Sequence, residues 1–407
     1  MNLRPINIAI SPNLEFDDFL LALKTLIFGA NNKAVEKVTG WFEKRFPGYK
    51  AFTFNSGRSA QYALLKAAGV GPGDEVLVQA FTCVAVPNSV IWTGAKPVYA
   101  DIKKNTYNMD PVNLVKKITP KTKAVIVQHT FGQPADLERI KKICQKNNLL
   151  LIEDCAHALG AKYKGKLVGS LSDAAFFSFG RDKIISSVFG GVAITKDKSL
   201  AKRISLVSAD TPQSSAFWVK QQLMHPIITW FILPCYNLGL GKLSLWLAQH
   251  LKLVSKAVYK KEHGAKRPKF FPAKLSRELA VLALNQLKKL DRFNNHRRQI
   301  ASTYFKAFRN STIKLPQNDP GSVYLRFCVQ VKSPYTIYKR AKKQGMLLGN
   351  WYGDVITPAK DYSLVHYKLG TCPVAEKVSP KVLNLPTYPL LTLPQAKKLV
   401  DNIKHWL

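Results

Sequence analysis

The stretch from Leu149 to Thr195 constrains the fold of this chain more than any other. It begins with four apolar residues, Leu149–Ile152, and this run ends at two carboxylates, Glu153 and Asp154. A short apolar run that stops at polar residues is typical of a buried strand. Asp154 is therefore expected at the carboxyl end of that strand, which is where ligands bind in open α/β sheets.

A second predicted strand, Ala174–Phe179, is followed by Lys183 among small residues and glycines. A lysine in an apolar pocket can act as a neutral amine and form a Schiff base with a carbonyl. Such a lysine, with an acidic partner for a pyridine nitrogen, is what a protein contributes to pyridoxal phosphate (PLP) chemistry. Spacing alone leaves an ordinary alternative open, in which Asp154 caps a helix and Lys183 is a solvated surface residue.

The words IEDCAHALGAKYKGKLVGSLSDAAFFSFGRDKI and FGGVAIT resemble the sugar aminotransferases of the DegT/DnrJ/EryC1/StrS family, which are fold-type-I PLP enzymes. The resemblance implies that Asp154 contacts the pyridine nitrogen of PLP and that Lys183 binds its aldehyde. It also implies that His157 lies near the cofactor ring and that Ser178 is a phosphate ligand.

An apolar strand leads through Asn55-Ser56-Gly57 into a predicted helix that runs from Ser59 to Ala68. Backbone amides at the start of a helix can bind phosphate, although many such turns bind nothing. The resemblance implies that Gly57, Arg58 and Ser59 hold the PLP phosphate. Many family members have threonine where this chain has Arg58.

Two positions depart from the pattern of the family. The family places an aromatic ring over the cofactor at the position of Cys83, which cannot stack in the same way, so we expect neighbouring Phe81 to substitute. The Asn-Tyr-Arg-Met motif of the family, whose asparagine reaches the partner subunit's PLP phosphate, aligns with Pro272-Ala273-Lys274-Leu275. We expect Lys274 or Lys269 to supply that contact.

Strands alternate with helices through the first half of the chain. Val76–Val78 and Ala124–Gln128 are predicted strands, and a helix N-capped by Asp136 follows the second of them. This alternation predicts an α/β fold with a mostly parallel sheet covered on both faces by helices. His129 follows a strand at the presumed ligand edge, so it is either a substrate-binding residue or a structural histidine.

The resemblance implies a fold-type-I PLP transferase with a smaller α+β C-terminal domain. We expect residues 1–254 to form the N-terminal region and the large PLP-binding domain, and residues 255–407 to form a linking helix and the small domain. The words NLPTYP and NWY in the second part are similar to family sequences. They make Trp351 and Tyr352 candidates for substrate contacts.

Residues 205–254 are apolar and aromatic with basic ends. Their uncharged part is too short, and too interrupted by prolines, for a bilayer span of about 20 residues. Two alternatives remain, an interfacial helix on an anionic membrane and an insertion that packs on the domain or covers the active site. The net charge of +36 predicts attraction to anions, or only a solvated basic surface.

Composition describes a folded, two-domain protein, with 407 residues of which 46% are hydrophobic. Six scattered cysteines form neither a disulfide framework nor a metal site. The N-terminus has acidic residues where a signal peptide would need an apolar core. We therefore expect a cytoplasmic protein, at most at the inner membrane face.

The function implied by the resemblance is PLP-dependent amination of a nucleotide-linked keto-sugar, with glutamate as amino donor, in surface polysaccharide or glycoconjugate synthesis. A homodimer is expected on the same ground. Lys183 argues against the related sugar dehydratases, which carry histidine at this position. The other alternative is a non-catalytic protein of the same fold that binds anions or a membrane surface. Nucleic-acid binding is not expected, because the basic residues form no recognised motif.

Overall fold

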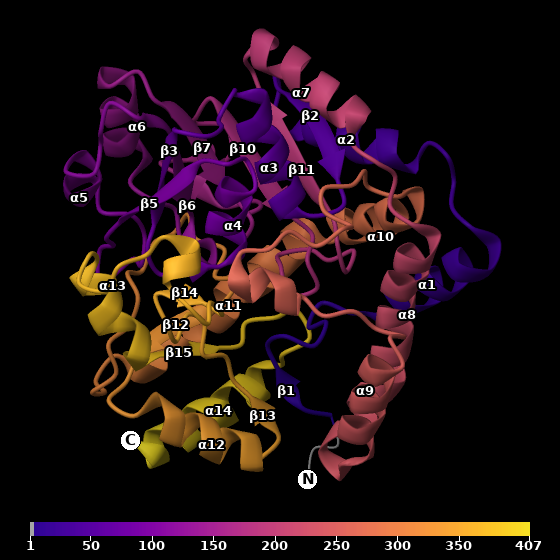
Figure 1. Cartoon of the computed structure of the whole chain (residues 1–407). Coiled ribbons are helices and arrows are strands. Elements are labelled where there is room, and N and C mark those ends of the chain that lie inside the picture. The colour runs from indigo at the N-terminus through magenta and orange to yellow at the C-terminus, as the bar shows by residue number, and fades with distance from the viewer. Residues whose placement is uncertain (1–3) are drawn as a thin grey trace.

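The computed structural model describes residues 4–407, and its centre is a seven-stranded sheet in the order β2-β11-β10-β7-β6-β3-β5 (Figure 1). The strands are β2 (Lys50–Phe54), β3 (Glu75–Gln79), β5 (Lys96–Ala100), β6 (Thr122–Gln128), β7 (Leu150–Asp154), β10 (Ala174–Ser178) and β11 (Gly191–Thr195). Four of the six pairings are parallel, and the two made by β11 are antiparallel. The mostly parallel sheet expected from the sequence is therefore confirmed.

Helices cover both faces of this sheet. Consecutive residues of a strand point to opposite faces, and in β7 Leu151 joins one hydrophobic cluster while Ile152 joins the other. The Leu151 side is covered by α2 (Ala34–Arg45), α6 (Leu137–Lys146) and α10 (Arg277–Lys288), and the Ile152 side by α3 (Gly57–Ala67), α4 (Ala85–Ile91) and α7 (Lys198–Asp210). The apolar strands are thus buried on both faces, as parallel sheets require.

Several helices begin where a polar side chain caps them. Ser276 precedes α10 and accepts a hydrogen bond from the backbone N–H of Leu279, three residues on. Asp197 caps α7 in the same way. Asp136 precedes α6 as expected, but its side chain makes no capping bond and instead pairs with Lys103 at 3.2 Å. The start of α6 was therefore predicted correctly. The predicted capping bond of Asp136 is not made, because its carboxylate pairs with Lys103 instead.

A third hydrophobic cluster forms the smaller C-terminal part of the protein. It contains β12 (Phe327–Gln330), β15 (Val382–Leu385), α12 (Pro334–Lys343) and α14 (Leu393–Trp406), and α11 (Leu290–Phe308) links it to the sheet domain. The N-terminal strand β1 (Ile6–Asn7) pairs with β13 (Met346–Leu347) in this part. The first described residues therefore pack with the small domain, whereas the sequence grouped them with the large one.

The apolar insertion is helical. It consists of α8 (Ala216–Ile232), η2 (Leu233–Leu238) and α9 (Leu240–His250), and α8 packs against α1 (Phe16–Phe28). Trp218 and Leu223 of α8 are buried in the large hydrophobic cluster. A search of residues 4–407 for a helix long and apolar enough to cross a membrane finds none.

Short elements complete the fold. They are β4 (Thr82–Cys83), α5 (Pro111–Val115), η1 (Thr130–Gly132), β8 (Lys162–Tyr163), β9 (Lys166–Leu167), η3 (Lys260–Gly264), β14 (Ile356–Thr357), η4 (Ser363–Val365), α13 (Pro373–Val378) and η5 (Ser379–Lys381). The pairing of β14 with β4 brings the small domain to the edge of the candidate site.

Candidate active site

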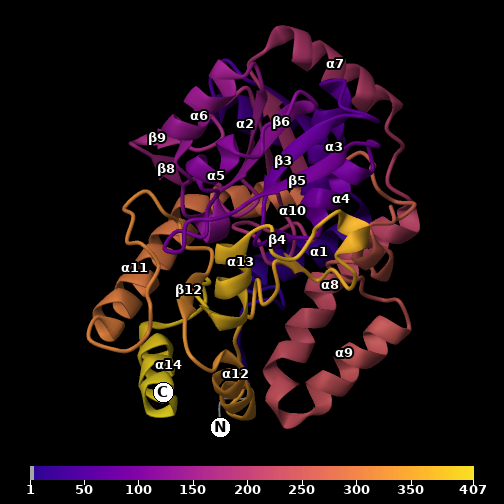
Figure 2. The ribbon, with the colours of Figure 1, turned by 60° about the vertical axis from the view of Figure 1, so that its left-hand side comes forward.

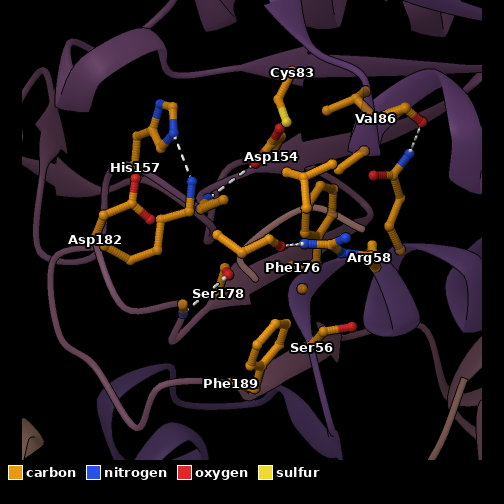
Figure 3. A pocket seen from close by; sticks show the side chains of 18 of the residues that line it. Ser56, Arg58, Cys83, Val86, Asp154, His157, Phe176, Ser178, Asp182 and Phe189 are labelled. Atoms are coloured by element: carbon orange, nitrogen blue, oxygen red, sulfur yellow. Dashed lines mark hydrogen bonds between the residues drawn. The ribbon is translucent and has the colours of Figure 1, made fainter. Parts of the chain in front are cut away.

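A cavity lies at the carboxyl ends of β7 and β10, beside the start of α3 (Figure 3). Asp154 is the last residue of β7 and Ser178 the last of β10, and both line the cavity. His157 and Lys183 come from the loops that follow these two strands, and they line it too. The topology of the sheet thus gathers the four residues that the sequence analysis placed in two neighbouring strand–loop units.

The start of α3 approaches β10 very closely. A Cβ added to Gly57 would lie 2.7 Å from Cβ of Ser178, so only glycine allows this approach. Ser56 caps α3 by accepting a hydrogen bond from the backbone N–H of Ser59 at 3.1 Å. The free amides of an 11-residue helix therefore face the cavity and favour an anionic group such as phosphate.

Ser59 lies behind this helix start. Its hydroxyl donates to Asn55 Oδ1 at 2.7 Å, and its side chain is fully buried outside the lining of the cavity. The hydroxyl that lines the cavity is that of Ser56, which the sequence analysis did not select. The sequence did contain a signal for Ser56, because serine directly before a helix is a preferred N-cap.

Asp154 is buried with one hydrogen bond to one of its carboxylate oxygens. Its Oδ1 accepts from the backbone N–H of Ala156 at 2.9 Å. Burial raises the pKa of this carboxyl to about 6, although Ala156 and Lys183 act in the opposite direction. A buried carboxylate of this kind needs a cation, and a protonated ring nitrogen in the cavity would supply one.

Lys183 and His157 form a hydrogen-bonded pair, with Nζ and Nε2 separated by 2.9 Å (Figure 3). The Nδ1 atom of His157 accepts from the backbone N–H of Phe131 at 3.3 Å. Burial and the charge of Lys183 hold the pKa of His157 well below its usual range, so the ring is neutral. A neutral ring that accepts at Nδ1 carries its proton on Nε2. The contact between Nε2 of His157 and Nζ of Lys183 therefore holds the lysine side chain in position at the cavity.

Two arginines line the cavity, and both are hydrogen-bonded to residues 255–262. Arg58 forms an ion pair with the buried Glu262 and donates to the carbonyl of Ala257 at 2.9 Å. Arg181 donates to the carbonyl and the hydroxyl of Ser255, each at 2.8 Å. Its Nε atom is buried and has no hydrogen-bond partner within residues 4–407. Residues 255–262 thus hold both guanidinium groups, and Ala257 and Val258 of this segment line the cavity.

The small domain contributes Trp351 and Tyr352 to the lining, and both are candidates for substrate contacts from the sequence. The Arg326 guanidinium lies 4.2 Å from the centroid of the Trp351 ring and donates to Asp182 at 2.5 Å. Burial alone would raise the pKa of Asp182, but Lys183 and Arg326 outweigh it and lower that pKa. The ion pair therefore connects the small domain to the loop that carries Lys183.

His129 does not line the cavity. Its Nδ1 accepts from the backbone N–H of Ala135 at 3.0 Å, and its Nε2 lies 3.0 Å from the carboxylate of Glu153. Side chains alternate along a strand, so Gln128 faces the cavity while His129 faces the other side, as Asp154 and Glu153 do in β7. His129 is therefore a structural histidine. The residue of this segment that lines the cavity is Gln128.

Glu153 and His129 also lie close to Cys155, a grouping that could bind a metal ion by its atom types. The carboxylate of Glu153 is already saturated by hydrogen bonds. Its donors are His129 and Ser172 and the backbone N–H groups of Gly169 and Leu171. These bonds account for the burial of Glu153 without an ion.

The aromatic residue expected over the cofactor is not supplied by Phe81. Phe81 is fully buried, with its ring stacked on Tyr107 at 5.3 Å between centroids and edge-on to Tyr352 at 5.3 Å. Cys83 itself lines the cavity, and burial raises the pKa of its thiol. This wall of the cavity therefore carries a small side chain instead of a ring.

Lys274 does not line the cavity of its own chain. Its ammonium group donates to the carbonyl of Ala209 at 3.0 Å, and Lys269 is exposed. Residues missed by the sequence analysis also include Arg181, Asp182 and Arg326. The first two lie beside Lys183 in the sequence and could have been selected by that proximity, whereas Arg326 had no such signal.

Comparison with known proteins identifies the family of this chain. The model of the DegT/DnrJ/EryC1/StrS aminotransferase family matches residues 20–243 and 246–404. The pleiotropic regulatory protein of Geobacillus stearothermophilus is 30% identical over 86% of this chain and 83% of its own length. The dTDP-3-amino-3,6-dideoxy-alpha-D-galactopyranose transaminase of Aneurinibacillus thermoaerophilus is 29% identical over 97% of this chain and 99% of its own.

Solved structures share the fold. S. venezuelae DesV, crystallised with a ketimine intermediate, superposes with a TM-score of 0.77 at 24% identity, over 99% of this chain and 98% of its own. The match of the family model extends over nearly the whole chain and includes Asp154, His157 and Lys183. On these grounds the chain belongs to the DegT/DnrJ/EryC1/StrS aminotransferase family.

Proposed function

We propose that this aminotransferase uses PLP to transfer an amino group from glutamate to a keto-sugar carried on a nucleotide. The observation that carries the proposal is the pair of Lys183 and His157, 2.9 Å apart, in one cavity with the buried carboxylate of Asp154. The names of relatives support the substrate class, because several are transaminases of nucleotide-linked sugars.

The residues of the cavity fit PLP at three points. Ser56, Gly57 and Ser178 would hold the phosphate at the start of α3, where Arg181 has an unpartnered buried Nε. Asp154 would bind the ring nitrogen, and Lys183 would bind the aldehyde. When bound there, PLP supplies an electron sink for the carbon that loses and gains the proton.

The side chains have separate tasks in this proposal. The contact with His157 would hold Nζ of Lys183 in position, and Lys183 would attack a carbonyl as a neutral amine. Lys183 then moves a proton as general acid and base. Asp154 keeps the ring nitrogen protonated, and Trp351 with residues 255–262 excludes water from the cavity.

We infer that the active form is a homodimer, in which Lys274 or Lys269 of one chain reaches the phosphate site of the other. Lys269 is exposed and Lys274 is half-buried, and neither lines the cavity of its own chain, so both are candidates for a contact with a second copy. Sedimentation should give twice the chain mass of 45.6 kDa. If Lys274→Ala and Lys269→Ala both leave PLP affinity unchanged, the role given to these lysines is wrong.

The visible absorption spectrum with added PLP tests the cofactor and the donor together. Wild-type protein should develop a cofactor band that glutamate bleaches, and Lys183→Ala should show only the spectrum of free PLP. Incubation with a nucleotide-linked keto-sugar should then give a product that contains nitrogen. A product that has lost oxygen without gaining nitrogen would identify a dehydratase. Absence of any band in the wild type would favour the non-catalytic alternative.

A further inference from the structure

The end of the apolar insertion forms a projecting helical hairpin, residues 231–253, which we call the hairpin arm. It contains η2 and α9, which pack against each other and against α8. Figures 1 and 2 show the arm standing apart from the central sheet, at the end of the molecule opposite α7. None of its residues lines the candidate active site.

One face of α9 is fixed against the rest of the arm. Gly241 and Ala248 are buried, and their spacing of two helical turns places them on the same face. A Cβ added to Gly241 would lie 2.5 Å from the carbonyl oxygen of Ile232, so the two helical segments are in close contact. The orientation of α9 is therefore determined, and so is the face that it presents outward.

The outward face of α9 is apolar. At 100° per residue, Leu243 lies about 150° from the direction of Gly241 and Ala248, and Leu247 lies about 110° from it on the same side. These two residues are 55% and 43% exposed. The arm also exposes Phe231, Leu238, Leu240, Trp246, Leu251 and Leu253. Exposed apolar surface concentrated on one projection is typical of an interaction site.

The charge around this surface has one sign. Residues 211–261 contain no aspartate or glutamate, and their lysines are Lys220, Lys242, Lys252, Lys256, Lys260 and Lys261. Lys242 and Lys252 are exposed near the two ends of α9. An apolar face flanked by cations is complementary to a surface that is apolar beneath a layer of negative charge.

We propose that the hairpin arm docks on an anionic lipid surface, with α9 parallel to the membrane plane. Leu243, Leu247 and Trp246 enter the boundary between headgroups and acyl chains, and Lys242 and Lys252 contact lipid phosphates. A helix of 11 residues is about 16 Å long, which suits a helix in the membrane plane.

Charge favours a membrane over a second copy of this chain as the occupant. Two hairpin arms that packed face to face would bring their acid-free, lysine-bearing surfaces together, and like charges in contact oppose association. The net charge of +36 adds a long-range attraction to anionic lipid.

Flotation of the full-length protein with lipid vesicles tests the proposal. The protein should float with vesicles of phosphatidylcholine and phosphatidylglycerol at low salt, and binding should weaken at high salt or with phosphatidylcholine alone. Leu243→Ser with Leu247→Ser should reduce the partition coefficient at least about tenfold. Lys242→Gln with Lys252→Gln should reduce it about 30-fold at low salt.

Matched substitutions elsewhere control for apolarity and charge. Leu369→Ser alters a side chain that is 65% exposed outside the arm, and Lys198→Gln with Lys202→Gln alters two exposed lysines of α7. These variants should float like the wild type. Equal binding to neutral and anionic vesicles, or unchanged flotation of the leucine variant, would overturn the proposal. A lipid-free change of oligomeric state in the leucine variant would identify a second copy as the occupant instead.

Discussion

At the scale of single residues, burial determines which groups in the cavity carry charge. Asp154 lacks a cationic side chain in direct contact, and His157 is held neutral between Phe131 and Lys183. Both groups are costly in a cofactor-free protein and become useful when a ring with a basic nitrogen and a carbonyl enters. The protonation states of Asp154 and His157 therefore suit a ligand that has a basic ring nitrogen and a carbonyl group.

Asp154→Asn should stabilise the cofactor-free protein at neutral pH. The pKa of Asp154 is raised from 3.8 to about 6 in the folded state. The folded protein therefore holds this proton more tightly than the unfolded chain, and the group destabilises the fold as pH rises through 6. The difference corresponds to about 3 kcal/mol at pH 7 and vanishes below about pH 4.

Urea unfolding of both proteins without PLP at about pH 4 and pH 7 measures this effect. The stability of Asp154→Asn relative to wild type should increase with pH. Added PLP should stabilise the wild type more than the variant, because only the wild type pairs a carboxylate with the ring nitrogen. A difference between the two proteins that does not change with pH would contradict the role given to burial.

Substitutions of His157 separate the donor role from simple packing. His157→Gln retains an N–H that can reach Nζ of Lys183, whereas His157→Phe retains the ring shape without a donor. Formation of the PLP absorption band should be about tenfold slower in the phenylalanine variant and near normal in the glutamine variant. Equal rates in the two variants would show that the hydrogen bond does not position the lysine.

At the scale of elements, the anion site depends on how closely α3 approaches β10. Gly57→Ala should push the helix away, because the added methyl group would lie 2.7 Å from Cβ of Ser178. We expect a loss of about 1 to 3 kcal/mol in stability and a weaker affinity for PLP. Thermal unfolding and PLP titration measure the two effects.

The double variant Gly57→Ala with Ser178→Gly removes the contact from the other side. It should recover part of the lost stability if the clash is the cause. Gly40 of α2 is the matched control, since no atom lies within 4 Å of its added Cβ. Gly40→Ala should leave PLP affinity unchanged and stabilise the helix by about 0.5 to 1 kcal/mol.

Residues 255–262 determine the partners of the Arg58 side chain. By the family resemblance Arg58 is a phosphate ligand, yet its guanidinium pairs with Glu262 and with the carbonyl of Ala257. Arg181 meets the same segment at Ser255. Both arginines line the cavity, and residues 255–262 hold their guanidinium groups there. Ala257 and Val258 of the same segment form part of the cavity wall.

At the scale of the whole molecule, the cavity lies between the central sheet and the C-terminal part that contributes Trp351. The contact between them includes the buried ion pair of Arg326 and Asp182, whose side chains are 2% and 8% exposed. Arg326 also covers the ring of Trp351. The position of the small domain is therefore coupled to the loop that carries Lys183.

Arg326→Leu should destabilise the protein by about 3 to 5 kcal/mol, because it leaves Asp182 buried without its ion-pair partner. Arg326→Leu with Asp182→Asn should cost less than the sum of the two single changes, as urea unfolding would show. The deficit of Arg326→Leu should shrink in acid, where Asp182 becomes protonated. Lys142→Met, at an exposed ion pair, is the control and should have no measurable effect.

The sequence alone determined the strands, the start of α3 and the positions of Asp154 and Lys183 at one edge of a mostly parallel sheet. These features follow from local rules, because apolar runs, glycine turns and the ends of strands depend on neighbouring residues. The family resemblance added His157 and Ser178, and the structure places both in the cavity.

Only the tertiary structure decided which side chains face the cavity. It turned Gln128 inward and His129 outward, buried Phe81 in an aromatic cluster, and gave Arg58 a carboxylate partner 204 positions away. It also brought Arg326 against Asp182, 144 positions away. Partners so distant in the chain are chosen by the packing of whole elements, and no local pattern of residues records that choice.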